Sequence, residues 1–158
     1  MEITVASEEA MHTLAARFAE VLPPGMIVYL HGPLGVGKTT FVRGVLQALG
    51  HVGAVHSPTY TLLETYQLEN VVVCHSDLYR LADPLELEYL GLRERFDGAA
   101  VCFIEWPEHG VGVLPPADFD VDIRYAGEAR HVHISAHSEQ ARHSLGQMVT
   151  TPHDGARK

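Results

Sequence analysis

The feature that most constrains this chain is a glycine-rich segment, GPLGVGKT at residues 32–39, which fits the pattern G-x-x-x-x-G-K-[ST]. It directly follows a short apolar run at residues 26–30, which predicts a buried strand. It directly precedes residues 39–49, whose apolar positions recur at helical spacing. Such a loop binds phosphate, because glycine N–H groups and the positive end of the helix dipole attract phosphate oxygens. The sequence therefore predicts a nucleotide site in which Lys38 reaches the β- and γ-phosphates and Thr39 ligates Mg²⁺.

The charge composition restricts the partners of this site. The chain has 20 acidic and 11 basic residues, for a formal net charge of −9, and Lys38 and Lys158 are its only lysines. A chain this acidic is a poor nucleic-acid binder by itself, because that affinity comes largely from neutralising phosphates. No apolar run approaches the roughly 20 residues that span a bilayer, and the acidic start does not resemble a secretion signal. We therefore expect a soluble, cytoplasmic protein, with Cys74 and Cys102 as buried free thiols.

Periodicity along the chain predicts an α/β fold with a mostly parallel central sheet flanked by helices and with antiparallel edge strands. At 158 residues we expect one domain, at residues 1–137. Few large apolar residues follow, so residues 138–158 are expected to be a flexible tail. The expected helices are residues 8–22, 39–49 and 84–96; the expected strands are residues 26–30, 60–66, 71–75, 99–104, and a hairpin of 121–125 with 131–135.

Two acidic residues follow apolar strands where a magnesium site would need carboxylates. Asp77 comes after VVVCHS and Glu105 after AVCFI. In a nucleotide-binding sheet one such acid contacts the metal, and the other polarises water or holds the first in place. The residues alone do not assign the two roles.

The remaining polar patterns leave alternatives open. Residues 57–61 (SPTYT) fit either a loop that senses the γ-phosphate or the plain start of a strand. Trp106 fits a packing corner better than a ring stacked near the nucleotide. The scattered histidines do not form a metal signature, and the alternating acids Asp118, Asp120 and Asp122 are expected on a solvent-facing strand surface. No N-K-x-D motif for guanine is present, which leaves ATP as the default nucleotide.

Five sequence blocks together resemble the TsaE (YjeE) family of bacterial ATPases. They are HGPLGVGKTTFVRGVLQALGH, SPTYTLLETY, HSDLYRLADPLELEYLGLRE, FIEWPEHGVGVLP and GEARHVHIS, in order and over about residues 3–137. The resemblance implies a Mg²⁺-dependent ATPase that supports the TsaD and TsaB proteins in forming N6-threonylcarbamoyladenosine on tRNA next to the anticodon. It also implies that the tRNA is engaged through those partners, and that basal hydrolysis is slow and partner-dependent.

The resemblance also implies roles for individual residues. Thr39 and Glu105 would ligate Mg²⁺, with Lys38, Asp77 and Glu105 acting in catalysis. The nucleotide would be bound by Gly32, Gly35, Val36, Gly37, Lys38, Thr39, Thr40, Thr4, Ser7, Thr61, Trp106 and Arg130. Pro33 and Ser76 depart from the family pattern, which usually has an acidic residue and Phe at these positions; because proline lacks an N–H, ATP affinity or basal rate is expected to differ from that of relatives.

Two other functions suit a phosphate-binding loop in a chain of this length. The first is a small-metabolite kinase, although the sequence has neither a D-x-D pair soon after the first helix nor an arginine-rich lid. The second is a non-hydrolysing switch, in which ATP orders residues 57–61 for docking to a partner. Loss of function in Glu105→Ala would indicate that hydrolysis is needed, whereas retained function would indicate the non-hydrolysing switch.

Overall fold

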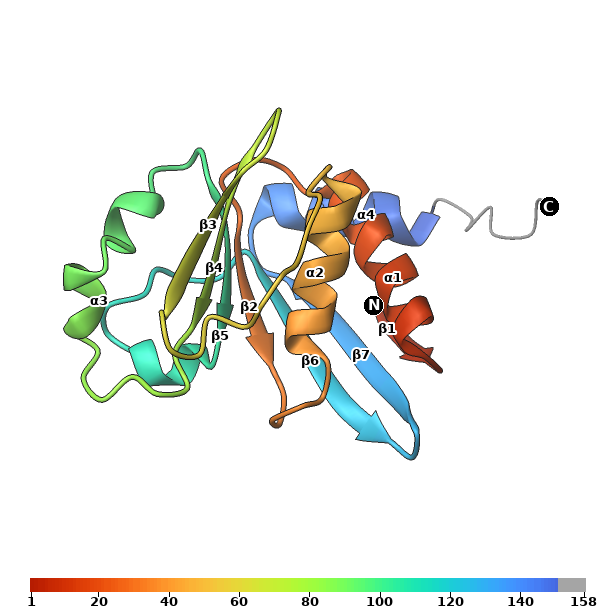
Figure 1. The fold of residues 1–158 in the computed structure, drawn as a ribbon. Helices are drawn as coiled ribbons and strands as arrows, with labels where there is room; N and C mark the ends of the chain where they lie inside the picture. Colours follow the sequence, from red (N-terminus) through yellow and green to blue (C-terminus); the bar gives the residue numbers. More distant parts are fainter. Residues whose placement is uncertain (151–158) are drawn as a thin grey trace.

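The computed structural model describes residues 1–150 and is built on a seven-stranded sheet with the order β1-β7-β6-β2-β5-β4-β3 (Figure 1). The strands are β1 (Glu2–Val5), β2 (Ile27–His31), β3 (Leu63–Gln67), β4 (Val72–Asp77), β5 (Val101–Glu105), β6 (Phe119–Ala126) and β7 (Ala129–Ala136). The helices are α1 (Glu8–Val21), α2 (Lys38–Ala48), α3 (Glu86–Tyr89) and α4 (Glu139–Thr150), with short 3₁₀ turns η1 (Arg93–Arg95) and η2 (Pro107–Gly110).

The predicted mixed sheet is confirmed. Strands β4, β5, β2 and β6 pair in parallel, whereas β3, β7 and β1 join antiparallel. The carboxyl ends of β2, β4 and β5 therefore lie at one edge of the sheet, where open α/β sheets bind ligands. The glycine-rich loop follows β2 at this edge, Glu105 ends the neighbouring strand β5, and Asp77 ends β4, the next strand beyond β5.

Apolar side chains cover both faces of the sheet. On one face α1, α2 and α4 pack together, and Phe18 contacts the rings of Phe41 and Phe119 at centroid distances of 5.5 and 5.1 Å. On the other face Leu78, Leu87 and Leu92 form a second core together with four side chains of the sheet, Ile27, Cys74, Cys102 and Ile104. A sheet buried on both sides explains why β2, β4 and β5 read as short, nearly continuous apolar runs.

The expectation of a flexible tail from residue 138 is wrong for residues 139–150, which form α4. Ala141 and Met148 are buried two turns apart on this helix, and the Arg17 guanidinium donates a hydrogen bond of 2.9 Å to the Met148 carbonyl. Ser138 accepts from the Ala141 N–H at 3.2 Å and so begins the helix. Few apolar residues suffice because they fall on one helical stripe; residues 151–158 lie outside the described part.

The single helix expected at residues 84–96 is also wrong. Helix α3 ends after one turn at Tyr89, and Gly91 then takes a left-handed φ of +72° before the η1 turn. A left-handed glycine ends a helix at little steric cost. The chain instead uses Leu87 and Leu92 as two separate contacts with the second core.

The acids expected on a solvent-facing strand surface are partly buried and have specific partners. Asp118 accepts from the Ile27 N–H at 2.8 Å, and Asp120 lies between the rings of His31 and His137 at 2.6 and 2.5 Å. The buried free thiols expected at Cys74 and Cys102 are confirmed. Within residues 1–150, no helix is long and apolar enough to span a membrane.

Candidate nucleotide site

The loop between β2 and α2 adopts a conformation that needs glycine. Gly32, Gly35 and Gly37 have φ values of +144°, +75° and +124°, which side chains disfavour. A Cβ on Gly32 would lie 2.4 Å from the carbonyl oxygen of Ile123, so β6 also excludes a side chain there. Helix α2 starts at Lys38, and its N-cap residue, Gly37, has no side chain that could accept a hydrogen bond from the first N–H groups of the helix. Its first N–H groups are therefore open to an anion held by the loop.

Lys38 is folded back into this loop. The side chain is buried, its Nζ donates a hydrogen bond of 2.5 Å to the Gly32 carbonyl, and the same nitrogen lies 3.8 Å from the centre of the Trp106 ring. Desolvation lowers the pKa of the Lys38 ammonium, and the negative charges of Glu105 and Asp77 oppose that shift. A buried cation with one carbonyl partner is suited to receive phosphate oxygens.

Thr39 and Glu105 meet where α2 begins and β5 ends. The Thr39 hydroxyl donates to Glu105 Oε2 at 3.1 Å, although the two residues are far apart in sequence. His75 on β4 also reaches Oε2, with its Nε2 at 2.5 Å. His75 was not predicted as a site residue; the only sequence signal was its place in a strand that ends in Asp77. The predicted pair of strand-end acids is brought together, because Asp77 and Glu105 are register partners.

Asp77 binds the loop that the sequence assigned either to phosphate sensing or to the start of a strand. Its Oδ2 accepts from the hydroxyls of Ser57 at 2.9 Å and Thr59 at 3.2 Å, and its Oδ1 accepts from the Tyr79 N–H at 3.0 Å. Thr61 is not part of this contact: it is exposed and its hydroxyl donates to Glu64 at 3.0 Å. Strand β3 starts only at Leu63, so residues 57–61 form a loop.

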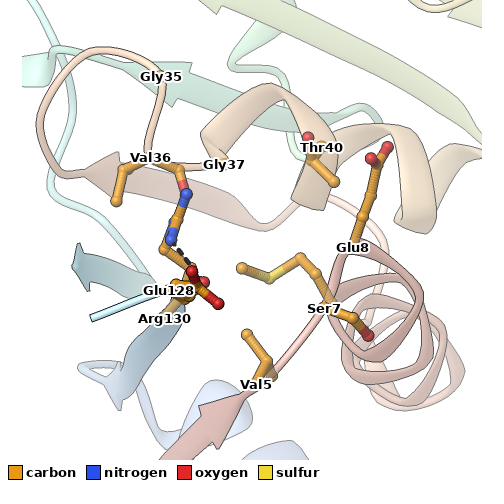
Figure 2. Close-up of a pocket in the computed structure, with 10 residues that line it drawn as sticks. Val5, Ser7, Glu8, Gly35, Val36, Gly37, Thr40, Glu128 and Arg130 are labelled. Atoms are coloured by element: carbon orange, nitrogen blue, oxygen red, sulfur yellow. Dashed lines mark hydrogen bonds between the residues drawn. The ribbon is translucent and has the colours of Figure 1, made fainter. Parts of the chain in front are cut away.

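A pocket of about 230 Å³ lies beside the glycine-rich loop (Figure 2). It is lined by the end of β1, the start of α1, the loop itself and β7: Val5, Ser7, Glu8, Met11, Gly35, Val36, Gly37, Thr40, Glu128 and Arg130. The predicted residues Ser7, Thr40 and Arg130 are therefore brought together. Thr4 is not, because side chains alternate along β1, and Thr4 is exposed where Val5 is buried against the pocket.

The β6–β7 hairpin holds the glycine-rich loop through two side chains. Arg130 Nε donates to the Val36 carbonyl at 2.9 Å, and the Tyr125 hydroxyl donates to the Leu34 carbonyl at 3.1 Å. The Arg130 guanidinium also lies 4.4 Å from the centre of the Tyr125 ring. Sequence reasoning missed Tyr125, since nothing in its neighbourhood indicates a contact 91 residues away.

Trp106 takes a left-handed backbone conformation directly after β5, with φ +56°. Its ring packs against Tyr79 and His109 at centroid distances of 5.1 and 5.8 Å, as the packing interpretation predicts. The Lys38 ammonium also lies over the Trp106 ring, 3.8 Å from its centre. A non-glycine residue held in this conformation is often found at a functional site.

The donor set fits a magnesium nucleotide. A threonine hydroxyl and two buried carboxylates, from Thr39, Glu105 and Asp77, are the hard oxygen ligands or water holders that Mg²⁺ requires. The loop supplies backbone N–H groups and the Lys38 ammonium for phosphates, and the adjoining pocket is large enough for part of a ligand.

Fold and site together define an α/β protein of the P-loop NTPase-like class. The sequence profile of the family described as "Threonylcarbamoyl adenosine biosynthesis protein TsaE" matches residues 5–133. The chain therefore belongs to the TsaE family, which acts in tRNA threonylcarbamoyladenosine biosynthesis.

Two relatives and one solved structure illustrate the similarity. A Haemophilus influenzae protein named tRNA threonylcarbamoyladenosine biosynthesis protein TsaE is 47% identical over 137 residues, 84% of this chain and 87% of the relative. A Bacillus subtilis protein of the same name is 40% identical over 127 residues, 79% of this chain and 77% of the relative. The crystal structure of Bacillus subtilis YdiB superposes with a TM-score of 0.81 at 27% identity, covering 94% of this chain and 93% of that one.

Proposed function

We propose that this protein binds and hydrolyses Mg²⁺-ATP, and thereby supports TsaD and TsaB in forming N6-threonylcarbamoyladenosine on tRNA next to the anticodon. The observation that carries the proposal is the meeting of Lys38, Thr39 and Glu105 at the end of the glycine-rich loop. A cation for phosphates and a hydroxyl beside a buried carboxylate are the elements that phosphoryl transfer uses. The reaction would take place in the cytoplasm.

ATP binding is assigned to three parts of the site. The phosphates would accept hydrogen bonds from the backbone N–H groups of Gly35 and Gly37 and from the Lys38 ammonium. Lys38 would then give up its hydrogen bond to the Gly32 carbonyl. The pocket between Ser7 and Arg130 continues from the loop and would accept the nucleoside. Thr40, in the first turn of α2, lines the same pocket and would contact the nucleotide there. These positions extend from the start of α1 to β7.

The metal would be held by the Thr39 hydroxyl and the Glu105 carboxylate. When bound, Mg²⁺ neutralises charge that develops on the phosphate oxygens. Asp77 is tied to Ser57 and Thr59 rather than to Thr39, so we assign it to positioning the 57–61 loop and the attacking water. The burial of both carboxylates keeps their charges close to the phosphates and little screened by solvent.

The role toward tRNA is indirect. A formal charge of −9 opposes binding to a polyanion, so contact with tRNA would come from TsaD and TsaB. The same acidic surface suits association with a basic partner surface, which would speed the encounter. As the family resemblance implies, we expect the isolated protein to hydrolyse ATP slowly and the two partners to alter that rate.

The test is a reconstituted modification assay with this protein, TsaD, TsaB, tRNA and the activated threonylcarbamoyl donor. We expect multiple turnover to require this protein and to be lost in Lys38→Ala. Glu105→Ala should retain ATP binding without Mg²⁺ but lose turnover. Turnover that is independent of this protein would overturn the proposal, and full activity of Glu105→Ala would favour a non-hydrolysing switch instead. A Cys74→Val variant, altered in the same sheet away from the loop, serves as the matched control.

A further inference from the structure

We propose that His75 is a positioning residue that orients the Glu105 carboxylate for the metal, an inference that rests on the proposed Mg²⁺-ATP function. His75 lies on β4, one strand away from Glu105 on β5, and is fully buried. Its Nε2 is 2.5 Å from Glu105 Oε2. Because a carboxylate oxygen accepts, Nε2 carries the hydrogen and donates.

One carboxylate oxygen of Glu105 therefore accepts two hydrogen bonds from within the protein. Oε2 accepts from both His75 Nε2 and the Thr39 hydroxyl, at 2.5 and 3.1 Å. Within residues 1–150, Oε1 accepts no hydrogen bond from the protein. Two donors on Oε2 fix the rotation of the carboxylate and leave Oε1 for Mg²⁺ or its water. Hydrogen bonds of this kind to ligating groups set both geometry and affinity at metal sites.

The cost of burying His75 argues against a purely structural role. Its Nδ1 is buried and has no hydrogen-bond partner among the described residues. A buried polar atom without a partner destabilises the fold, and Val73, on the same strand, shows that β4 accommodates an apolar residue. An imidazole at this position is thus explained by what Nε2 does for Glu105 rather than by packing.

The inference predicts different behaviour for three substitutions. His75→Gln retains an N–H donor at about the reach of Nε2, His75→Asn places its amide one bond short, and His75→Leu removes the donor while keeping a buried apolar side chain. Only His75→Gln still donates a hydrogen bond from β4 to Glu105 Oε2. Cys74→Val, at the preceding buried position, is the control for disturbance of the strand.

The measurement is the affinity for a non-hydrolysable ATP analogue with and without Mg²⁺, by titration calorimetry, together with urea unfolding of each variant. We expect the Mg²⁺ concentration at half-saturation to rise about 10- to 100-fold in His75→Leu and His75→Asn. Metal-free affinity should stay within about twofold of the wild type, and His75→Gln should restore most of the Mg²⁺ response.

Two results would overturn the inference. One is an unchanged Mg²⁺ midpoint in both His75→Leu and His75→Asn beside a normal wild type. The other is an equal loss of affinity with and without metal, which would indicate general damage to the site. If His75→Leu does not fold, the contrast between His75→Gln and His75→Asn decides alone. A wild type whose nucleotide binding ignores Mg²⁺ would overturn the proposed function and this inference together.

Discussion

The ammonium nitrogen of Lys38 lies 3.8 Å from the centre of the Trp106 ring while it donates to the Gly32 carbonyl. The site therefore holds the Lys38 ammonium on an aromatic face and a carbonyl, both of which are weaker partners than a phosphate. Trp106 is in turn held by Tyr79 and His109. The proposed phosphate binding and the environment of Trp106 would thus be coupled through the side chain of Lys38.

Tryptophan fluorescence should report this coupling. Trp106 is the only tryptophan in the chain, so a change in emission on adding ATP comes from this position. We expect a saturable change in wild type as Lys38 moves from the ring to the phosphates, and none in Lys38→Met. A Lys38→Met titration with the same amplitude and midpoint as wild type would contradict the coupling.

Removing the Lys38 charge should stabilise the nucleotide-free protein. Desolvation lowers the pKa of Lys38 below 10.5, so the unfolded state binds the proton more tightly and burial of the charge costs stability at neutral pH. We expect Lys38→Met to unfold at a temperature a few degrees higher, since roughly 1 kcal/mol corresponds to about 2–4 °C at this chain length.

The pH dependence gives the sign of that effect. Between the lowered pKa and 10.5 the native lysine loses its proton first, so wild-type stability rises with pH relative to Lys38→Met. Urea unfolding should show that the difference in free energy of unfolding between Lys38→Met and wild type narrows from pH 7 to pH 10. A difference that widens over this range would show that the charge stabilises the fold.

The two hairpin contacts should set the affinity of the glycine-rich loop. Tyr125→Phe removes the hydrogen bond to Leu34 but keeps the ring beneath Arg130. We expect ATP affinity to fall about two- to fivefold, as for the loss of one hydrogen bond of roughly 0.5–1 kcal/mol. Tyr89→Phe, on the 91% exposed side chain of α3, is the matched control and should bind ATP as wild type does.

Asp77 should matter for hydrolysis more than for binding. Asp77→Asn retains the shape but weakens acceptance from the Ser57 and Thr59 hydroxyls. We expect a fall in kcat of at least about tenfold, as for the loss of a positioned polar group, with metal-free ATP affinity nearly unchanged. Faster amide exchange at residues 57–61 should accompany it. Unchanged exchange there would mean that Asp77 does not hold the loop.

Helix α4 should contribute to stability. A chain ending at residue 137 loses the buried side chains of Ala141 and Met148 and the carbonyl partner of Arg17. Burial of one methionine is worth roughly 1.5–3 kcal/mol, so the free energy of unfolding should fall by at least about 2 kcal/mol. A chain ending at residue 150 keeps these contacts of Ala141, Met148 and Arg17 and serves as the control. Equal urea midpoints for the two chains would contradict this assignment.

The central strands of the fold and the main residues of the site can be predicted from local sequence patterns. The motif at residues 32–39 and the apolar runs before Asp77 and Glu105 are adjacent in sequence to what they predict, so periodicity finds them. The family resemblance places Thr4 at the nucleotide, but the sequence pattern does not predict β1, and only the alternation of that strand shows that Val5, not Thr4, faces the pocket.

Other site residues were beyond local reasoning because their partners are distant in sequence. His75 meets Glu105 across 30 positions, and Tyr125 meets Leu34 across 91. A strand pattern predicts that such side chains face one side of a sheet, but not which neighbouring strand they meet. The register of β4 on β5, which brings Asp77 beside Glu105, is visible only in the folded sheet.

The pairing of β1 with β7 has a consequence for how the protein matures. Glu2 is opposite His133, so the wall of the pocket formed by Ser7 and Arg130 does not exist until nearly the whole chain has been synthesised. Contacts between residues this far apart in sequence also carry a large loop-closure entropy and slow folding. If the protein binds ATP as proposed, the nucleotide cannot guide the early steps of folding, but it would stabilise the finished fold by about 2.7 kcal/mol at a hundredfold excess over Kd. Cellular ATP would thus stabilise a newly synthesised chain only after its folding is nearly complete.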